Sequence, residues 1–306
     1  MGQTTITQLL GIRYPIIAAP MFLVSNVEMV VAVSEAGGLG TFPALNARNS
    51  DMFREMVRAI KQRTNAPFGV NLILLNNPRL EDDMRICLEE KVPVLITSLG
   101  DPSRLIQEAH RHGIHVFCDV VNVRHAQKAK AAGADALVAV SAGAGGHAGV
   151  ITPFVLIPWL KRETQLPVIA AGGLADGVSL AGALALGADA GYFGTRFIAS
   201  EEAPVEAAFK QAICAASPED IEYTPEVTGH PANFLRDSLL QWRESQAAGE
   251  SDLKRWRDVW SAGQTVGLIE AVKPCATIVQ EIVREYEEAR SGMVAIPLAA
   301  SSGGAR

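Results

Sequence analysis

Eight short apolar runs recur along the chain, and most of them are followed by a stretch with helical spacing of apolar residues. Each run is too short for a free-standing helix and lacks polar alternation, which is typical of parallel strands buried on both faces. The predicted strands are Pro15–Met21, Leu39–Leu45, Phe68–Leu74, Val92–Leu99, His115–Val121, Ala136–Ala142, Pro167–Gly173 and Ala190–Phe197.

Glycines and caps mark the ends of the helices between these strands. We expect helices over Val27–Ala36, Ser50–Lys61, Ser103–His112, Arg124–Ala132 and Gly177–Leu186. Near-identical phrases, Ala131–Ala136 and Ala185–Ala190, precede the sixth and eighth predicted strands. Eight strand–helix units close a barrel, whereas an open sheet usually stops at five or six strands. The pattern predicts an α/β fold, a (β/α)8 TIM barrel.

After the eighth strand the pattern changes, and a charged segment with three tryptophans (Trp242, Trp256, Trp260) follows a polar, turn-rich stretch, 217–236. We interpret 201–259 as a C-terminal helical lid inserted beside the barrel mouth. The chain is then one domain, 1–306, with the barrel at about 12–200 and 260–290 and a poorly ordered tail at 292–306. An apolar lid also makes a homodimer conceivable.

The length of 306 residues, 48% hydrophobic content and 20% charged content suit one large globular domain. The net charge of −6 argues against nucleic acid or an anionic membrane as a partner. We find neither a secretory signal nor a membrane-spanning run, and therefore expect a cytoplasmic protein. The cysteines lack metal-type spacing, and Cys87 and Cys118 sit in apolar stretches, which indicates buried thiols in a reducing compartment.

Candidate chemistry gathers at the ends of the predicted strands, where TIM barrels bind their ligands. The seventh strand ends in Gly172–Gly173 and the eighth in Gly194–Thr195. Two glycine-bearing ends on neighbouring strands form a phosphate grip, with backbone N–H groups and the Thr195 hydroxyl as donors. The alternative is that these glycines only permit tight turns. Strand alternation favours an outward Arg196.

The sixth strand leads into a loop of small residues, 141–149, that contains His147. A neutral imidazole is a natural base for removing a proton from carbon beside an electron-withdrawing group. A lone histidine is often structural, but the glycine-rich setting at a strand end favours catalysis or ligand contact. His110, His112 and His115 lie at the opposite end of the barrel, so we predict no metal site there.

Further polar residues sit near the same ends. Asn71, a lone amide in an apolar strand, needs partners, which either a ligand or a neighbouring strand would supply. Thr97, Ser98 and Asp119 are either wall or cofactor contacts or simple caps, and we retain Asp119 as cofactor-binding. Gln264, flanked by glycines, suggests a loop returning to the site.

Taken together, these segments resemble the nitronate monooxygenase (2-nitropropane dioxygenase) family of flavin barrels. The resemblance is carried by PIIAAPM (15–21), AGGLGTFPAL (36–45), FGVNL (68–72), AGGHAG (144–149), PVIAAGGLADG (167–177), GADAGYFGTRF (187–197) and WSAGQTVGLI (260–269). The combination of AGGHAG, AGGLADG and GTRF is specific. Many members of that family carry a glutamate where this chain has Gly143.

The resemblance implies a flavoprotein oxidoreductase that holds FMN without a covalent bond, uses no metal and oxidises alkyl nitronates with O2 to a carbonyl compound and nitrite. His147 would take the α-proton of a nitroalkane or hold the nitronate. The implied flavin contacts are Ala19, Pro20, Met21, Asn71 and Gln264, with Gly145 and Gly146 beside the ring and Gly172, Gly173, Gly194 and Thr195 on the phosphate.

Three other functions remain open from the residues. The nearest is an FMN-dependent NAD(P)H reductase resembling enoyl-ACP reductases or NADH:quinone reductases, which needs no separate nicotinamide fold. A second keeps the barrel but binds a sugar or nucleotide phosphate. A third is a barrel that stores flavin or senses a ligand without catalysis.

Overall fold

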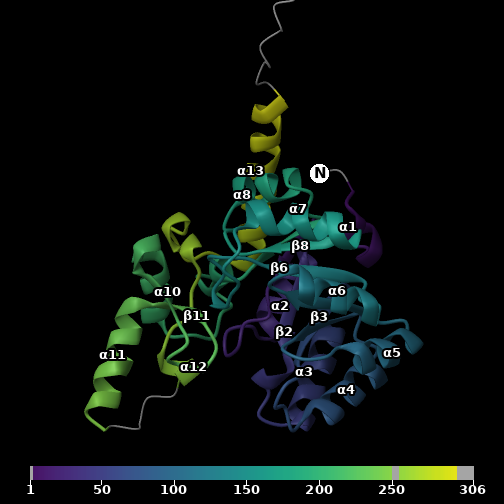
Figure 1. The fold of residues 1–306 in the computed structure, drawn as a ribbon, viewed down its shortest axis with the longest axis horizontal. Coiled ribbons are helices and arrows are strands. Elements are labelled where there is room, and N and C mark those ends of the chain that lie inside the picture. Colours follow the sequence, from purple (N-terminus) through teal and green to yellow (C-terminus); the bar gives the residue numbers. More distant parts are fainter. Residues whose placement is uncertain (1–2, 250–254, 295–306) are drawn as a thin grey trace, which may run out of the picture.

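The computed structural model describes residues 3–249 and 255–294, which contain a closed barrel of parallel strands and a small second sheet (Figure 1). The barrel order is β1-β2-β3-β4-β5-β6-β8-β9, so the predicted TIM barrel is confirmed. Its strands are β1 (Ile16–Ala18), β2 (Leu39–Pro43), β3 (Phe68–Ile73), β4 (Val94–Ser98), β5 (His115–Val120), β6 (Ala136–Val140), β8 (Val168–Ala171) and β9 (Ala190–Phe193).

The barrel closes where β1 pairs with both β2 and β9. Ile17 is the partner of Leu39 on one side and of Tyr192 on the other. All eight predicted strands are present. The eighth prediction, Ala190–Phe197, was too long: Gly194 leaves the extended region (φ −98, ψ −79), and Thr195–Ile198 form the short helix α9.

Helices cover the outside of the barrel, and a continuous layer of buried side chains lies between them and the strands. These helices are α2 (Val27–Glu35), α3 (Ser50–Arg63), α4 (Leu80–Glu89), α5 (Ser103–Arg111), α6 (Val123–Ala132), α7 (Pro153–Thr164), α8 (Gly177–Ala185) and α13 (Cys275–Val294), with a short 3-10 turn η1 (Ala44–Asn46) after β2. The five predicted barrel helices are present, with ends shifted by at most two residues.

The barrel interior is a separate hydrophobic cluster that includes Ile17, Ile96, Phe117 and Ile169. A helix that the sequence analysis did not anticipate, α1 (Thr5–Leu10), adds Ile6 to this cluster from the N-terminal side. Its first turn has a capping box at Thr4. The interior is thus filled from below, and a ligand can enter only from the end where the strands terminate.

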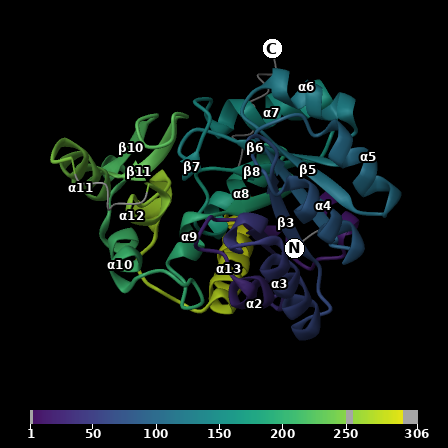
Figure 2. The ribbon, with the colours of Figure 1, turned by 90° about the horizontal axis from the view of Figure 1, so that it is seen from below.

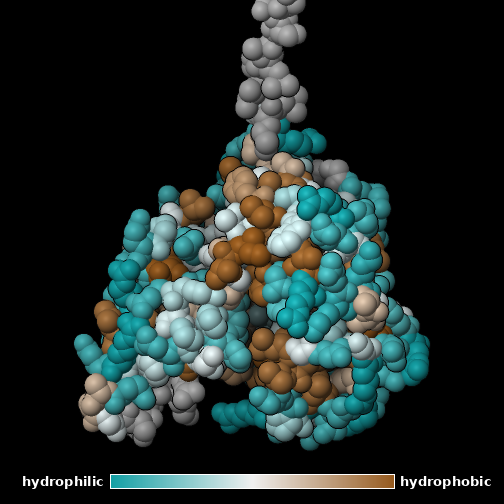
Figure 3. Space-filling model, viewed as in Figure 1, coloured by the Kyte–Doolittle hydropathy of each residue, from teal (hydrophilic) through white to brown (hydrophobic). Residues whose placement is uncertain are grey.

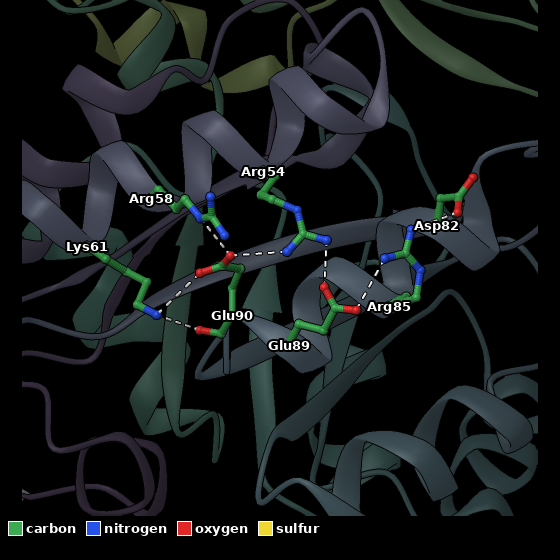
Figure 4. A network of polar contacts seen from close by, with 7 residues as sticks. All are labelled: Arg54, Arg58, Lys61, Asp82, Arg85, Glu89 and Glu90. Atoms are coloured by element: carbon green, nitrogen blue, oxygen red, sulfur yellow. Dashed lines mark hydrogen bonds and ion pairs between the residues drawn. The ribbon is translucent and has the colours of Figure 1, made fainter.

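An ion-pair network joins α3 and α4 on the outer surface (Figure 4). Arg54 donates to both Glu89 and Glu90, and Arg58 donates to Glu90. Arg85 of α4 also pairs with Glu89. Because most of these side chains are exposed, solvent screens each pair and its contribution to stability is small. The network connects two helices on the outer surface.

The lid, residues 201–259, lies to one side of the barrel and contains more than helices (Figure 2). Its helices are α10 (Ala207–Ala215), α11 (Arg236–Ala247) and α12 (Arg255–Asp258), with the 3-10 turn η2 (Pro218–Asp220). The stretch predicted as polar and turn-rich forms an antiparallel hairpin, β10 (Ile221–Thr224) and β11 (Ala232–Leu235). The helices of the predicted lid are present, and the hairpin is an addition, because four-residue strands leave too short an alternation to read from the sequence.

The lid has its own small core, formed by Val227, Ala232, Phe234, Leu239, Trp242 and Val259. Trp260 instead stacks on Phe209 of α10, with ring centroids 5.0 Å apart. The side chain of Trp256 lies outside the described residues. The part of the predicted tail beyond residue 294 also lies outside the described residues. Residues 292–294, which the prediction assigned to the tail, belong to helix α13. No described helix has the length and apolar character needed to span a bilayer.

Two glycines of α8 offer a test of this packing. A Cβ on Gly177 would lie 2.1 Å from the backbone N of Tyr286 in α13, whereas one on Gly182 meets nothing within 4 Å. We expect Gly177→Ala to lower the free energy of unfolding by about 3 kcal/mol through backbone overlap. The matched Gly182→Ala variant should raise it by about 0.5 kcal/mol, because alanine favours helix. Equal unfolding midpoints in urea would contradict the close α8–α13 contact.

Candidate active site

The strand ends predicted to bind a ligand meet on one rim of the barrel. Strands β8 and β9 are paired neighbours, with Ala171 opposite Tyr192, so the glycines that follow each strand lie side by side. Ala19, directly after β1, donates its backbone N–H to Phe193 O at 2.9 Å. The ends of β8, β9 and β1 thus form one continuous edge.

Open space lies beside two of these glycines. Gly173 has φ +82, and a Cβ there would meet nothing within 4 Å. A Cβ on Gly194 would meet only Ala19 Cβ at 3.8 Å and Met21 Sδ at 3.9 Å. Gly172 is different: its Cβ would lie 3.0 Å from Ser141 Oγ, so this glycine lets the loop after β6 approach. Gly173 and Gly194 therefore border a cradle that the described side chains leave unfilled.

Thr195 is buried, and its hydroxyl accepts the backbone N–H of Gly263 at 2.9 Å. The hydroxyl retains one proton to donate. The neighbouring Arg196 points away, as strand alternation suggested, and its guanidinium donates to Ala271 O at 3.1 Å. Burial lowers the pKa of Arg196. Thr195 thus belongs to the site, and Arg196 braces the outer segments.

The segment 262–264 packs against the glycine-rich loop after β6, as predicted for a loop returning to the site. Gln264 N donates to Gly143 O at 3.0 Å, and a Cβ on Gly143 would lie 2.8 Å from Gln264 Oε1. A Cβ on Gly145 would lie 2.9 Å from Gly263 N. The absence of side chains at positions 143 and 145 is what admits this segment, so Gly145 is required for loop packing.

The end of that loop forms a short strand, β7 (Gly146–His147), which completes the second sheet in the order β10-β11-β7. His147 is the backbone partner of Ala232, and Gly146 is the partner of Asn233. The Asn233 side chain also donates to Ala144 O at 2.7 Å, and the Tyr223 hydroxyl donates to Ala148 O at 2.9 Å. The lid hairpin therefore fixes the position of the histidine loop.

The imidazole of His147 is half-buried and faces the lid turn. Its Nε2 lies 3.2 Å from Thr228 Oγ1, and its ring meets that of His230 edge-on with centroids 5.9 Å apart. Burial lowers the pKa of His147, and the neighbouring His230 lowers it further. At neutral pH the imidazole is therefore uncharged, which is the form needed in a base.

A chain of polar side chains crosses the upper barrel interior. Asn71 Nδ2 donates to Ser98 Oγ at 2.8 Å and to Ile96 O at 3.2 Å, and Ser98 Oγ donates to Asp119 Oδ2 at 2.5 Å. The side-chain N–H groups of Asn71 are thus bound to the neighbouring strand β4. This is the structural alternative to a contact with a ligand. Thr97 alternates to the outer face, where its hydroxyl contacts Cys118 Sγ at 3.2 Å, so it is no site residue.

Two buried atoms at the end of this chain, Asp119 Oδ1 and Tyr192 OH, have no hydrogen-bond partner among the described residues. Burial raises the pKa of Asp119 to about 6 against the donation from Ser98. Burial and the Asp119 carboxylate raise the pKa of Tyr192. Unsatisfied polar atoms are costly in a protein interior, so these two atoms are candidates for contact with a polar group from outside the described residues.

Sequence reasoning missed four residues that the structure brings to the site: Tyr192, Thr228, His230 and Asn233. Tyr192 was visible as the one polar side chain in its strand, and strand alternation could have placed it inward. The lid residues carried no such signal, because only the pairing of β7 with β11 brings them to His147.

His110, His112 and His115 lie at the opposite end of the barrel, as predicted. His110 Nε2 is 2.9 Å from Asp135 Oδ2, and His115 Nδ1 is 3.8 Å from Asp135 Oδ1. Among the residues that the structure describes, no three His, Cys, Asp or Glu side chains gather as metal ligands do. Cys87 and Cys118 are buried free thiols, as expected.

Large apolar side chains are exposed around the rim. They follow the ends of β1, β3, β4 and β7 and comprise Phe22, Leu23, Leu75, Leu99, Val150 and Phe154; the last two are each 75% exposed. Figure 3 shows a hollow near the centre of one face with hydrophobic patches beside it. An apolar rim around a polar interior suits a substrate with a hydrophobic portion outside the reacting group.

Comparison with known proteins gives a consistent family. A sequence model described as nitronate monooxygenase matches residues 3–85 and 80–285. A nitronate monooxygenase of Paraburkholderia phytofirmans is 32% identical, covering 78% of each chain. A (3aS,4S,5R,7aS)-5-hydroxy-7a-methyl-1-oxo-octahydro-1H-indene-4-carboxyl-CoA dehydrogenase of Mycobacterium tuberculosis is 33% identical, covering 79% of this chain and 69% of its own. The solved structure of FabK from Thermotoga maritima is 36% identical, with TM-score 0.86, covering 96% of this chain and 99% of its own.

The raised pKa of Asp119 makes a prediction about stability. A carboxyl whose pKa is higher in the folded than in the unfolded protein lowers the free energy of unfolding at a pH above its folded pKa. That free energy is regained as the pH falls through about 6 and the folded protein takes up the proton. Between pH 7.5 and pH 5, the ligand-free wild type should gain about 1.4 kcal/mol relative to Asp119→Asn. Urea unfolding of both proteins at the two pH values measures the difference. A pH-independent difference would show that Asp119 has an ordinary pKa.

Proposed function

The chain belongs to the nitronate monooxygenase family, and from that premise we propose that it is an FMN-dependent enzyme that oxidises alkyl nitronates with O2 to a carbonyl compound and nitrite. The observation that carries this proposal is a half-buried histidine of lowered pKa, His147, in the loop after β6, which packs against Gly172 at the glycine-bearing end of the neighbouring strand β8. Membership of the family makes the chain a flavin-dependent oxidoreductase. The nitronate substrate is our proposal.

The residues present fit FMN. The open space beside Gly173 and Gly194 suits a phosphate, which accepts hydrogen bonds from backbone N–H groups and from the remaining Thr195 proton. The unpartnered Asp119 Oδ1 and Tyr192 OH suit the polar edge of a ring system. Further flavin contacts in this proposal are Ala19, Pro20, Met21, Asn71, Gly146, Gly172 and Gln264. Bound FMN would supply the electron acceptor for oxidation of the substrate.

His147 is the base in this proposal. A nitroalkane carries an acidic C–H beside its nitro group, and an uncharged imidazole removes that proton to give the nitronate. The resulting imidazolium and the nitronate have opposite charges, so the same side chain then holds the anion in place. The low pKa of His147 keeps this base available at and below neutral pH.

A second candidate is an NAD(P)H-dependent reductase or dehydrogenase acting on an acyl thioester. The specific observation in its favour is the apolar rim formed by residues such as Phe22, Leu99 and Phe154, which exceeds what a small nitroalkane needs. Similarity to the carboxyl-CoA dehydrogenase of Mycobacterium tuberculosis agrees with this alternative. In a dehydrogenase the neutral imidazole would take the α-proton of the acyl thioester, whereas in a reductase its protonated form would return a proton to that carbon.

The glycine cradle can be tested without reference to the substrate. Because a Cβ on Gly194 makes only ordinary contacts, Gly194→Ala should leave the stability of the flavin-free protein unchanged. The methyl group would nevertheless occupy the space reserved for the phosphate, and we expect FMN affinity to fall about 10-fold or more. Fluorescence titration with FMN measures this loss. Gly182→Ala, distant from the rim, is the control and should bind FMN as the wild type does.

The two candidate functions differ in what reduces the flavin. We expect anaerobic ethylnitronate or propyl-2-nitronate to bleach the flavin absorbance within the mixing time, and NAD(P)H to leave it unchanged. Under air, the nitronate should yield nitrite. Rapid bleaching by NADH or NADPH with none by nitronates would reject the monooxygenase and favour the reductase.

The role of His147 predicts a difference between two forms of the same substrate. His147→Ala should lower kcat/KM for the neutral nitroalkane by about 100-fold or more, because that form must lose a proton to the imidazole. The preformed nitronate needs no such step and should be affected less. For the neutral form, wild-type kcat/KM should stay constant from pH 8 down to the lowered pKa and then fall. Equal losses for both forms would remove His147 as the base.

A further inference from the structure

The lid turn between β10 and β11 places a hydroxyl, rather than a charged group, against the imidazole of His147. Thr228 Oγ1 lies 3.2 Å from His147 Nε2. It also lies 2.8 Å from the backbone carbonyl of His230 and 3.3 Å from the backbone nitrogen of His230. One oxygen atom thus has three polar neighbours, and its single proton can serve only one of them.

The direction of these bonds follows from what each neighbour can do. The carbonyl of His230 can only accept, so the Thr228 hydroxyl donates its proton there. The backbone N–H of His230 can only donate, so it uses a lone pair of Thr228. One acceptor position remains on Thr228 Oγ1. Imidazole nitrogens donate or accept according to the tautomer, and here Nε2 has to donate.

We propose that Thr228 is a positioning residue that holds His147 in the tautomer with its proton on Nε2, so that the basic lone pair resides on Nδ1. The lid therefore decides which nitrogen of His147 acts on a substrate. This assignment builds on the proposed role of His147 as a base, but the tautomer is a property of the resting protein. His230 takes part through its backbone.

The turn that carries Thr228 is anchored by the two residues before it. Val227 is fully buried in the lid core. Glu226 accepts two hydrogen bonds from Arg243 of α11, both at 2.8 Å. Arg243 also donates to Glu222 of β10 at 2.6 Å. The hairpin, its turn and α11 are thus held together next to Thr228.

Long-range 1H–15N NMR of the holoprotein, labelled with 15N-histidine, tests this assignment at a pH where His147 is neutral. His147→Gln identifies the signals among the six histidines of the chain. We expect Nε2 at the shift of a protonated nitrogen, Nδ1 at that of an unprotonated one, and slow exchange of the Nε2 proton. Thr228→Ser keeps the hydroxyl and should keep this pattern. Thr228→Val removes the acceptor and should give mixed tautomers with a rapidly exchanging proton.

His230→Gln is the matched control, because the acceptor for the Thr228 proton is a backbone carbonyl, and its tautomer pattern should match the wild type. Loss of the neighbouring ring should instead raise the pKa of His147. Thr228→Val should lower kcat/KM for a neutral nitroalkane about 10-fold, with Thr228→Ser close to wild type.

An unprotonated Nε2 of His147 in the wild-type spectrum would overturn the proposal whether or not the Thr228 variants fold. An unchanged, slowly exchanging Nε2 proton in Thr228→Val would overturn it as well. The spectra are recorded without substrate, so a protein with the expected tautomer but no nitronate turnover would refute the proposed function and leave this assignment standing.

Discussion

The pairing of β1 with β9 is the interaction on which the rest of this structure depends. It converts a row of parallel strands into a ring, and the ring directs the carboxyl end of every strand to the same rim. Residues as distant in sequence as Ala19 and Gly194 become neighbours only because of that closure. With the opposite end filled by α1, the interior has one entrance, and the polar chain of the upper barrel lies beneath it.

A second, smaller sheet holds the loop that follows β6 and carries His147. The two residues of β7 pair with a lid strand more than eighty positions later in the chain, and the segment 262–264 packs behind the same loop. Small residues make this possible, since side chains at Gly143, Gly145 or Gly263 would collide with the facing segment. The loop that holds His147 is therefore enclosed from two directions, by the lid strand and by the segment 262–264.

The layer of polar side chains under the rim lowers the stability of the barrel, because some of its buried atoms have no hydrogen-bond partner in the part of the chain that the structure describes. Asn71, Ser98 and Asp119 form a connected chain, yet within the described residues it ends at a carboxylate oxygen without a partner, close to an equally unpartnered tyrosine hydroxyl. A purely structural interior would carry apolar side chains at these positions, as the lower layer with Phe117 and Ile169 does. The contrast between the two layers separates an apolar part of the barrel that holds the fold from a polar part at the candidate site.

The sequence alone determined the barrel and the location of its ligand-binding end. Short apolar runs, their eightfold recurrence and glycine-bearing strand ends are local features. The strands, five of the helices and the positions of Gly173, Gly194, Thr195, His147 and Gln264 could therefore be inferred from the residues themselves. Only the tertiary structure decided the lid hairpin, the inward Tyr192 with its neighbour Asp119, and the contact of Thr228 and His230 with His147. These contacts join segments far apart in the chain through strand pairing and burial, and no local pattern of residues encodes which distant segment will supply the partner.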